Sequence, residues 1–148
     1  MQITAPKLII GLGNPLKEYL KTYHNAGFLF VDSLADGNFD KNKTFIFTKN
    51  NNFVLIKPLV FMNESGKAVS GAIKYFSSAA DKIKPEDILI VHDDSDIVLG
   101  DYKVSFGRSS AGHRGVESII KSLKTKNFWR LRIGIRSESD KRQATSDK

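Results

Sequence analysis

The stretch KLIIGL at residues 7–12, followed by GNP at residues 13–15, indicates how this chain folds. A short apolar run bounded by Pro6 and by a Gly-Asn-Pro turn is typical of a buried strand. The residue before a proline avoids the helical region, so the chain must turn at Asn14. The N-terminal part of the chain is therefore a strand that ends in a polar turn.

Strands and helices alternate outward from this stretch. Predicted helices cover residues 25–35, a segment opened by Ser65, and residues 116–123. Predicted strands cover residues 7–12, 43–49, 53–57, 87–91, 103–106 and 130–136, and the last alternates basic and apolar residues, which predicts one solvated basic face. This alternation favours an α/β fold. We expect a single three-layer αβα domain over residues 1–136, with a twisted mixed β-sheet flanked by helices, and a polar disordered tail at residues 137–148.

Composition excludes several classes of function. The chain has 148 residues and no cysteine, which rules out disulfide frameworks, iron–sulfur clusters and thiol nucleophiles. The net charge of +7 lies entirely in residues 99–148, because residues 1–98 carry equal numbers of acidic and basic side chains. This asymmetry favours a polyanionic partner such as a nucleic acid, although a solvated basic face gives the same pattern. With no long apolar run and no signal-peptide pattern, we expect a cytoplasmic protein, or one of an organelle matrix if a transit segment was removed, with no membrane contact.

Polar residues follow the apolar runs at several points. A single histidine near a carboxylate at a strand end can act as a general base with an orienting group. The polar segments that offer such groups are Tyr23-His24-Asn25 and His92-Asp93-Asp94, and their spacing alone does not show that they converge. The amides of Asn14 and Asn63 can hold a carbonyl and its developing oxyanion. Each residue also has a purely structural interpretation: Asn14 in a turn, Asn63 before a helix cap and His24 at a helix start.

A metal site is a second interpretation of the polar segments. His92 and His113, together with the aspartates at 93, 94 and 96, could bind a hydrolytic divalent ion. The competing interpretation is that both histidines fix loops at a strand end and a helix start.

Several motifs, taken together and in order, resemble the bacterial-type peptidyl-tRNA hydrolases. They are LIIGLGNP at residues 8–15, TYHNAG at 22–27, FMNESGKAV at 61–69, HDDSD at 92–96, GHRG at 112–115 and FWRLRIGI at 128–135. The resemblance runs from about residue 7 to residue 136. Such enzymes cleave the ester between a peptide, or an N-blocked amino acid, and the tRNA ribose, and so recycle tRNA.

The resemblance implies roles for individual residues. His24 matches the base that activates water, and Asp93 matches the carboxylate that orients it. Asn14 and Asn63 match the substrate-positioning amides, and Asn63 matches the partner of the carbonyl or oxyanion. Met62 and Tyr19 match positions in the same cleft. No metal and no cofactor is implied, the partner is peptidyl-tRNA, and we expect a monomer without an obligate protein partner.

The chain also departs from the family pattern. Leu16 and Arg114 stand where the family usually has glycine and asparagine, and the chain is C-terminally short. Arg114 can still bind substrate by holding a phosphate. We expect further phosphate contacts from Lys103, Arg108 and Arg132, the last matching a basic residue that helps to hold the tRNA 5′ end. A non-catalytic RNA-binding relative and, with less support, a metal-dependent phosphoesterase are the alternatives.

Overall fold

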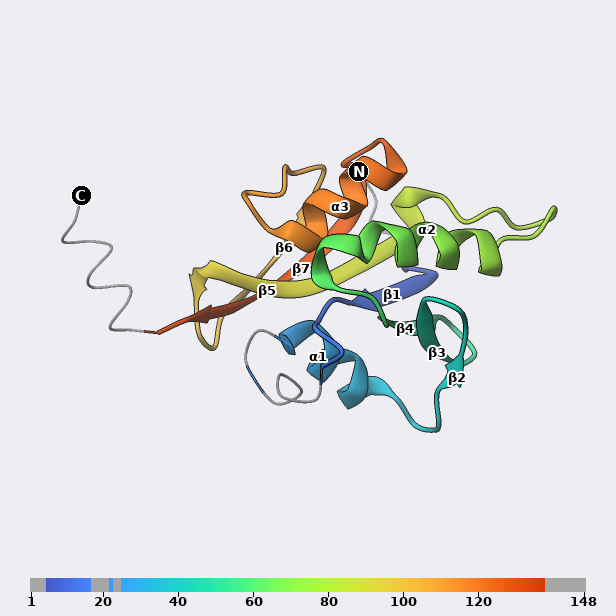
Figure 1. Cartoon of the computed structure of the whole chain (residues 1–148), viewed down its shortest axis with the longest axis horizontal. Coiled ribbons are helices and arrows are strands. Elements are labelled where there is room, and N and C mark those ends of the chain that lie inside the picture. The colour runs from blue at the N-terminus through green and yellow to red at the C-terminus, as the bar shows by residue number, and fades with distance from the viewer. Residues whose placement is uncertain (1–4, 17–21, 23–24, 138–148) are drawn as a thin grey trace.

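The computed structural model describes residues 5–16, 22 and 25–137, which form a seven-stranded mixed sheet with helices on both faces (Figure 1). The strands are β1 (Leu8–Gly11), β2 (Asp40–Lys41), β3 (Phe45–Lys49), β4 (Val54–Pro58), β5 (Ile88–Val98), β6 (Tyr102–Phe106) and β7 (Trp129–Arg136), in the spatial order β2-β3-β4-β1-β5-β7-β6. β1 pairs in parallel with β4 and β5, and β5 pairs in parallel with β7. The remaining pairs are antiparallel. The predicted α/β fold with a mixed sheet is confirmed.

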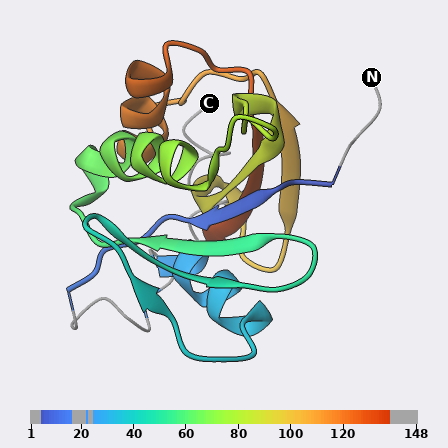
Figure 2. The same ribbon diagram turned by 90° about the vertical axis from the view of Figure 1, so that its right-hand side faces the viewer.

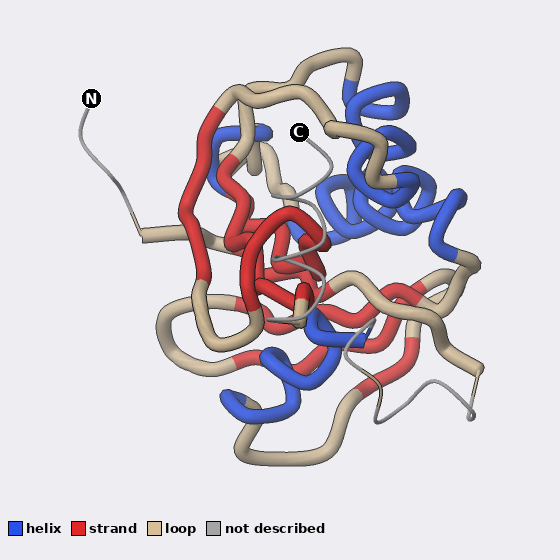
Figure 3. Tube along the Cα trace, turned by 90° about the vertical axis from the view of Figure 1, so that its left-hand side faces the viewer, coloured by secondary structure: helices blue, strands red, loops and turns tan. Residues whose placement is uncertain are grey.

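Three helices cover the sheet in the described part of the chain. α2 (Ser65–Phe76) and α3 (Arg114–Leu123) lie together on one face, and α1 (Ala26–Leu34) lies on the other (Figures 1 and 2). Figure 3 shows the strands in red between these two layers. Short 3₁₀ turns, η3 (Met62–Glu64) and η4 (Pro85–Asp87), precede α2 and β5. No helix among the described residues is long and apolar enough to cross a membrane.

β1 lies at the centre of the core, and its apolar side chains pack against the helices on both faces of the sheet. Leu8 and Ile10 are fully buried in the cluster that α2 and α3 cover, whereas Ile9 packs with Val31 of α1. A central parallel strand covered by helices on both sides is expected to read as a continuous apolar run. This is why residues 7–12 could be recognised as a buried strand.

The end of β1 opens a crevice beside β5. The last β1–β5 pair is Gly11 with Val91, after which the Leu12 N–H bonds to the Val91 carbonyl and the chain turns away. β1 leads into α1 on one face, and β4 leads into α2 on the other. Such a switch point, at the carboxyl ends of parallel strands, is where α/β sheets generally bind ligands.

The structure corrects two of the predicted strands. β5 does not end at residue 91 but continues through the acidic segment to Val98, because His92, Asp93 and Asp94 pair with β7. The basic face of β7 is not solvated: Arg130 is 2% and Arg132 is 6% exposed. Both arginines are buried because partners on β5 accept their hydrogen bonds. β2 was not predicted, and of the expected tail only residue 137 lies among the described residues.

Candidate active site

A cavity of about 430 Å³ lies at the carboxyl ends of β1 and β4 and beside the second half of β5. Asn14 follows β1, Met62 follows β4, Asp93 belongs to β5, and His113 and Arg114 begin α3. All five residues line this cavity. Segments that are distant in sequence therefore deliver amide, thioether, carboxylate, imidazole and guanidinium groups to one place.

Asn14 is held rigidly at the edge of the cavity. Its backbone N–H donates to Asn25 Oδ1 over 2.7 Å, and Asn25 Nδ2 donates back to the Asn14 carbonyl over 2.9 Å. Asn25 is fully buried. The Asn14 side-chain oxygen accepts the Leu16 N–H over 2.9 Å. Among the described residues the Nδ2 group of Asn14 has no partner, so this group can donate to a ligand carbonyl.

His113 and Asp93 form a hydrogen-bonded pair inside the cavity. His113 Nε2 lies 2.9 Å from Asp93 Oδ1. The other ring nitrogen, Nδ1, accepts the N–H groups of Gly115 and Val116 and so caps α3. Because Nδ1 is an acceptor, the proton lies on Nε2, and His113 donates to the carboxylate. The interpretation that His113 fixes a helix start is confirmed, and its bond to Asp93 is an addition that the sequence did not suggest.

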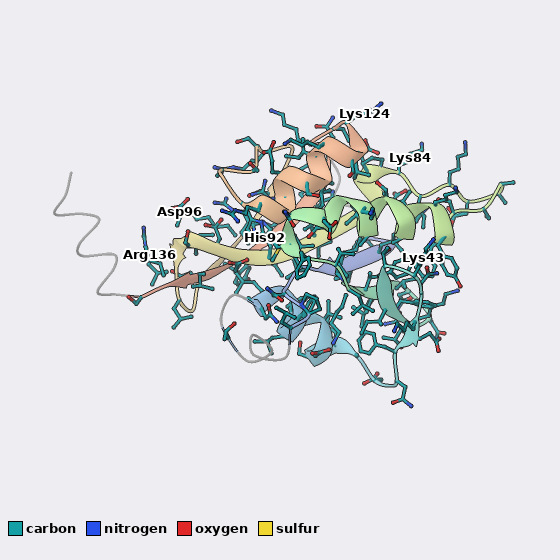
Figure 4. The ribbon with its side chains drawn as sticks, in the orientation of Figure 1. Lys43, Lys84, His92, Asp96, Lys124 and Arg136 are labelled. Atoms are coloured by element: carbon teal, nitrogen blue, oxygen red, sulfur yellow. The ribbon has the colours of Figure 1, made fainter. Side chains whose placement is uncertain are left out.

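His92 lies on β5 in the middle of the molecule (Figure 4) and is 1% exposed. Its Nδ1 donates to the Asp93 carbonyl over 2.7 Å, and its Nε2 accepts the Arg130 Nε–H over 3.1 Å. Burial, with a further contribution from nearby His113, lowers the pKa of His92 to about 3. His92 is therefore neutral at physiological pH.

The metal interpretation fits these contacts poorly. One nitrogen of His92, one of His113 and an Asp93 oxygen lie within 4.8 Å of one another, close enough to bind one ion. However, both ring nitrogens of both histidines are already engaged in hydrogen bonds. An ion would have to break the cap of α3, the His113–Asp93 pair or the Arg130 contact. The described arrangement is a hydrogen-bonded network rather than an open ligand set.

Met62 and Asn63 occupy different places although they are neighbours in sequence. Met62 lines the cavity, and its sulfur lies where a side chain on Gly115 would begin, 2.6 Å from an added Cβ. Glycine at 115 therefore lets η3 approach α3 closely. Asn63 is exposed and lines a second groove of about 360 Å³ along α3. Arg114 lines both hollows and connects them.

The predicted phosphate contacts divide into exposed and buried residues. Lys103 on β6 and Arg108 just after it are exposed, as a phosphate contact requires. Arg132 is buried, with Nε 2.8 Å from Asp94 Oδ2 and Nη1 3.1 Å from Ser105 Oγ. Burial alone raises the pKa of Asp94, but hydrogen bonds from Arg132 and from the Asp96 backbone outweigh it and hold the pKa below its usual value. As placed, Arg132 pairs with Asp94 and does not present its charge to solvent.

Two predicted residues, Tyr19 and His24, lie outside the described residues. Asn25, which follows His24 directly in the chain, lines the cavity. Sequence reasoning missed Asn25 and the buried role of Arg130. The alternation in residues 130–136 was the available signal for Arg130, but it does not say which face is buried.

Comparisons with known proteins identify the family. The peptidyl-tRNA hydrolase family model matches residues 8–147. A peptidyl-tRNA hydrolase of Aquifex aeolicus is 44% identical over 137 residues, which cover 87% of this chain and 69% of the relative. One of Metamycoplasma arthritidis is 44% identical over 133 residues, covering 87% of this chain and 71% of the relative. The crystal structure of the Acinetobacter baumannii peptidyl-tRNA hydrolase superposes with a TM-score of 0.79 at 35% identity, covering 99% of this chain and 76% of that one. This chain belongs to the peptidyl-tRNA hydrolase family.

Proposed function

We propose that this chain, a hydrolase of the peptidyl-tRNA ester bond by family, uses His24 as the general base and Asp93 as its orienting carboxylate. The observation that carries the proposal is the convergence of Asn14, Met62, Asp93 and Arg114 on one cavity. Asn25 adjoins His24 in the chain and lines the same cavity. Asn25 is in turn tied to Asn14 by two hydrogen bonds. The support for His24 is thus its place next to Asn25 in the chain.

The proposed reaction needs one base and hydrogen-bond donors for the carbonyl. His24 takes a proton from water as the water oxygen bonds to the ester carbon. The tetrahedral intermediate then expels the ribose oxygen, which leaves with a proton returned by His24. A positioned general base is worth roughly 10²–10⁴-fold, and one oxyanion donor about 10²–10³-fold. The resemblance implied Asn63 as the carbonyl partner, but Asn63 lines the neighbouring groove and not this cavity, whereas Asn14 lines the cavity. We therefore propose the Nδ2 group of Asn14 as the donor to the carbonyl.

Asp93 has two carboxylate oxygens, and the proposal uses them differently. Oδ1 accepts from His113. We assign Oδ2 to His24, where it would hold the imidazole in the correct tautomer and stabilise the imidazolium that forms during the reaction. The start of α3 lies beside Asp93 through His113, and the positive end of a helix favours the ionised carboxylate. This arrangement supports a charged Asp93 as the orienting group.

Arg114 and the groove along α3 are proposed to bind the substrate outside the reacting centre. Arg114 is exposed at the junction of the cavity and the groove, where Asn63 also lies. A guanidinium there can hold a phosphate of the tRNA 3′ strand with two hydrogen bonds. Lys103 and Arg108 are proposed as further phosphate contacts, whereas Arg132 would first have to leave Asp94. Tyr19 and Met62 are proposed to contact the substrate within the cleft, and we propose that a monomer acts in the cytoplasm.

Release of N-acetylated amino acid from N-acetylaminoacyl-tRNA, measured with EDTA present, tests the proposal. We expect turnover by the parent chain and a loss on the order of 10²-fold or more in His24→Ala and in Asp93→Asn. Lys84→Ala is the control and is expected to keep full activity, because Lys84 lines neither the cavity nor the groove and is labelled well apart from His92 in Figure 4. Full activity of His24→Ala would refute the assigned base. Loss of turnover in EDTA would instead favour a metal-dependent reaction, and salt-sensitive tRNA binding without turnover in the parent chain would favour an RNA-binding relative.

A further inference from the structure

Arg130 is the largest fully buried side chain in the described part of the molecule. Its partners there are a neutral ring and backbone oxygens rather than a carboxylate. Nε donates to His92 Nε2 over 3.1 Å, and Nη1 donates to the carbonyls of Arg108 and Ser109 over 3.1 and 2.8 Å. Asp94 lies near enough to favour the charged guanidinium, but its carboxylate accepts a hydrogen bond from Arg132. Burying a charge without a directly hydrogen-bonded opposite charge is costly, so such a residue is expected to serve a specific purpose.

These contacts belong to a closed ring of hydrogen bonds and backbone, called the circuit below, that passes through the candidate active site. Starting at the Asp93 carbonyl, the circuit passes through the His92 ring to the guanidinium of Arg130, and from there to the backbone at residues 108 and 109. The chain then runs to His113, whose Nε2 returns to the Asp93 side chain. The rings of His92 and His113 also contact each other, with centroids 4.5 Å apart. Asp93 is thus held at both its backbone and its carboxylate.

The loop between β6 and α3 needs external support because its backbone is unusual. Gly107, Ala111 and Gly112 have φ values of 71°, 50° and 88°. Alanine at positive φ is unfavourable unless the surroundings enforce it. The second half of the loop is tied to α3 by the Ser110 hydroxyl, which donates to Glu117 over 2.7 Å. Arg130 holds the first half through its two carbonyl contacts.

We infer that Arg130, oriented by His92, is a positioning residue for hydrolysis, because it fixes the loop at residues 107–113 and thereby the contact of His113 with Asp93. The inference rests on the role proposed above for Asp93. Arg130 touches no substrate in this scheme and acts through the loop.

The charge states of the two groups suit this role. Burial lowers the pKa of Arg130 to about 10, so the guanidinium remains charged and donates at neutral pH. Burial likewise keeps His92 neutral, so its Nε2 lone pair stays available as an acceptor. A protonated His92 would present a second donor to Arg130 and would break the circuit.

Two matched pairs of variants test the inference in the full chain. Arg130→Met fills a similar volume but donates no hydrogen bond, whereas Arg130→Lys can still donate to the loop carbonyls. His92→Leu removes the acceptor, whereas His92→Gln keeps an oxygen that can accept from Arg130. We expect kcat to fall about tenfold to a hundredfold in Arg130→Met and His92→Leu, with KM changed less than about twofold, and to recover in part in Arg130→Lys and His92→Gln.

The histidine ring nitrogens give a readout that is independent of catalysis. In the parent chain, long-range ¹H–¹⁵N spectra should show His113 protonated on Nε2, and in Arg130→Met a mixture of tautomers. Val31→Ala, which removes buried side-chain volume on the α1 face, is the control for stability loss alone. An unchanged His113 spectrum in Arg130→Met would overturn the inference, as would a fall in kcat no larger than that of Val31→Ala. If the His113 spectrum changes in Arg130→Met but Asp93→Asn keeps full activity, the contact between Arg130 and the loop is supported, and the role proposed for Asp93 is refuted instead.

Discussion

His92 should make the stability of this protein depend on pH in a way that can be calculated. Its pKa in the folded state is about 3, because burial disfavours the charged ring. A histidine in an unfolded chain has a pKa of about 6.5. Since the folded pKa is the lower one, the unfolded state binds the proton first. Stability is therefore complete above about pH 6.5 and is lost as the pH falls toward 3.

The size of the effect follows from proton linkage. Below the unfolded pKa, each pH unit costs the folded state about 1.4 kcal/mol per group that only the unfolded state protonates. Between pH 7 and pH 5, His92 alone should therefore lower the free energy of unfolding by about 2 kcal/mol. This is a large share of the roughly 5–15 kcal/mol that holds most domains folded.

Urea unfolding, followed by the fluorescence of the single tryptophan, Trp129, measures this quantity. The parent chain is compared with His92→Gln at pH 7 and at pH 5. Both proteins keep His24 and His113, so the contributions of those residues cancel in the difference between the two pH responses. The parent chain should lose about 2 kcal/mol more than His92→Gln over this range. Equal losses in the two proteins would show that His92 titrates normally and would refute its assignment as a buried neutral acceptor.

Two further predictions follow from packing and from charge. Gly66→Ala should cost about 1–3 kcal/mol in urea unfolding, because its Cβ would lie 2.2 Å from a backbone oxygen of α3, whereas Gly71→Ala in the same helix meets nothing closer than 3.5 Å and should stabilise by about 0.5–1 kcal/mol. Equal effects of the two changes would contradict the close approach of α2 to α3. Lys103→Ala and Arg108→Ala should each weaken tRNA binding and reduce the slope of log K against log salt by about 1, and a salt dependence identical to that of the parent chain would show that these residues make no phosphate contact.

Much of the fold could be predicted because local signals and tertiary structure agree. The apolar run at residues 7–12 became β1, and the helical spacing at 25–35 became α1. Ser65 does begin α2, although its hydroxyl bonds to the Met62 carbonyl rather than capping the helix. In each case the chain offers one favourable conformation, and packing selects the same one.

The candidate site was harder to predict because its key contacts depend on long-range pairing. The sequence indicated that Asn14, Met62 and Asp93 follow or end strands, and strand order then brings them together. The His113–Asp93 contact spans 20 residues and depends on the positive-φ loop between them. No local pattern encodes that geometry. Asn63 shows that adjacency in the sequence is also an insufficient guide, because Asn63 follows Met62 directly but does not line the same cavity.

The face of β7 that carries the arginines was predicted to be solvated but is buried, and this difference bears on the function. Period-two alternation in residues 130–136 was interpreted with the arginines outside, which is the usual solution when charged side chains have no partners. Here β5 carries His92 and Asp94 beside β7, and these accept from Arg130 and Arg132. Well-packed apolar side chains would stabilise such a strand pair as well or better, so stability alone does not explain buried charges at these positions. The guanidinium groups contribute directional hydrogen bonds, which apolar side chains cannot make. These bonds hold in place the strand that contains Asp93 and the loop that leads to His113.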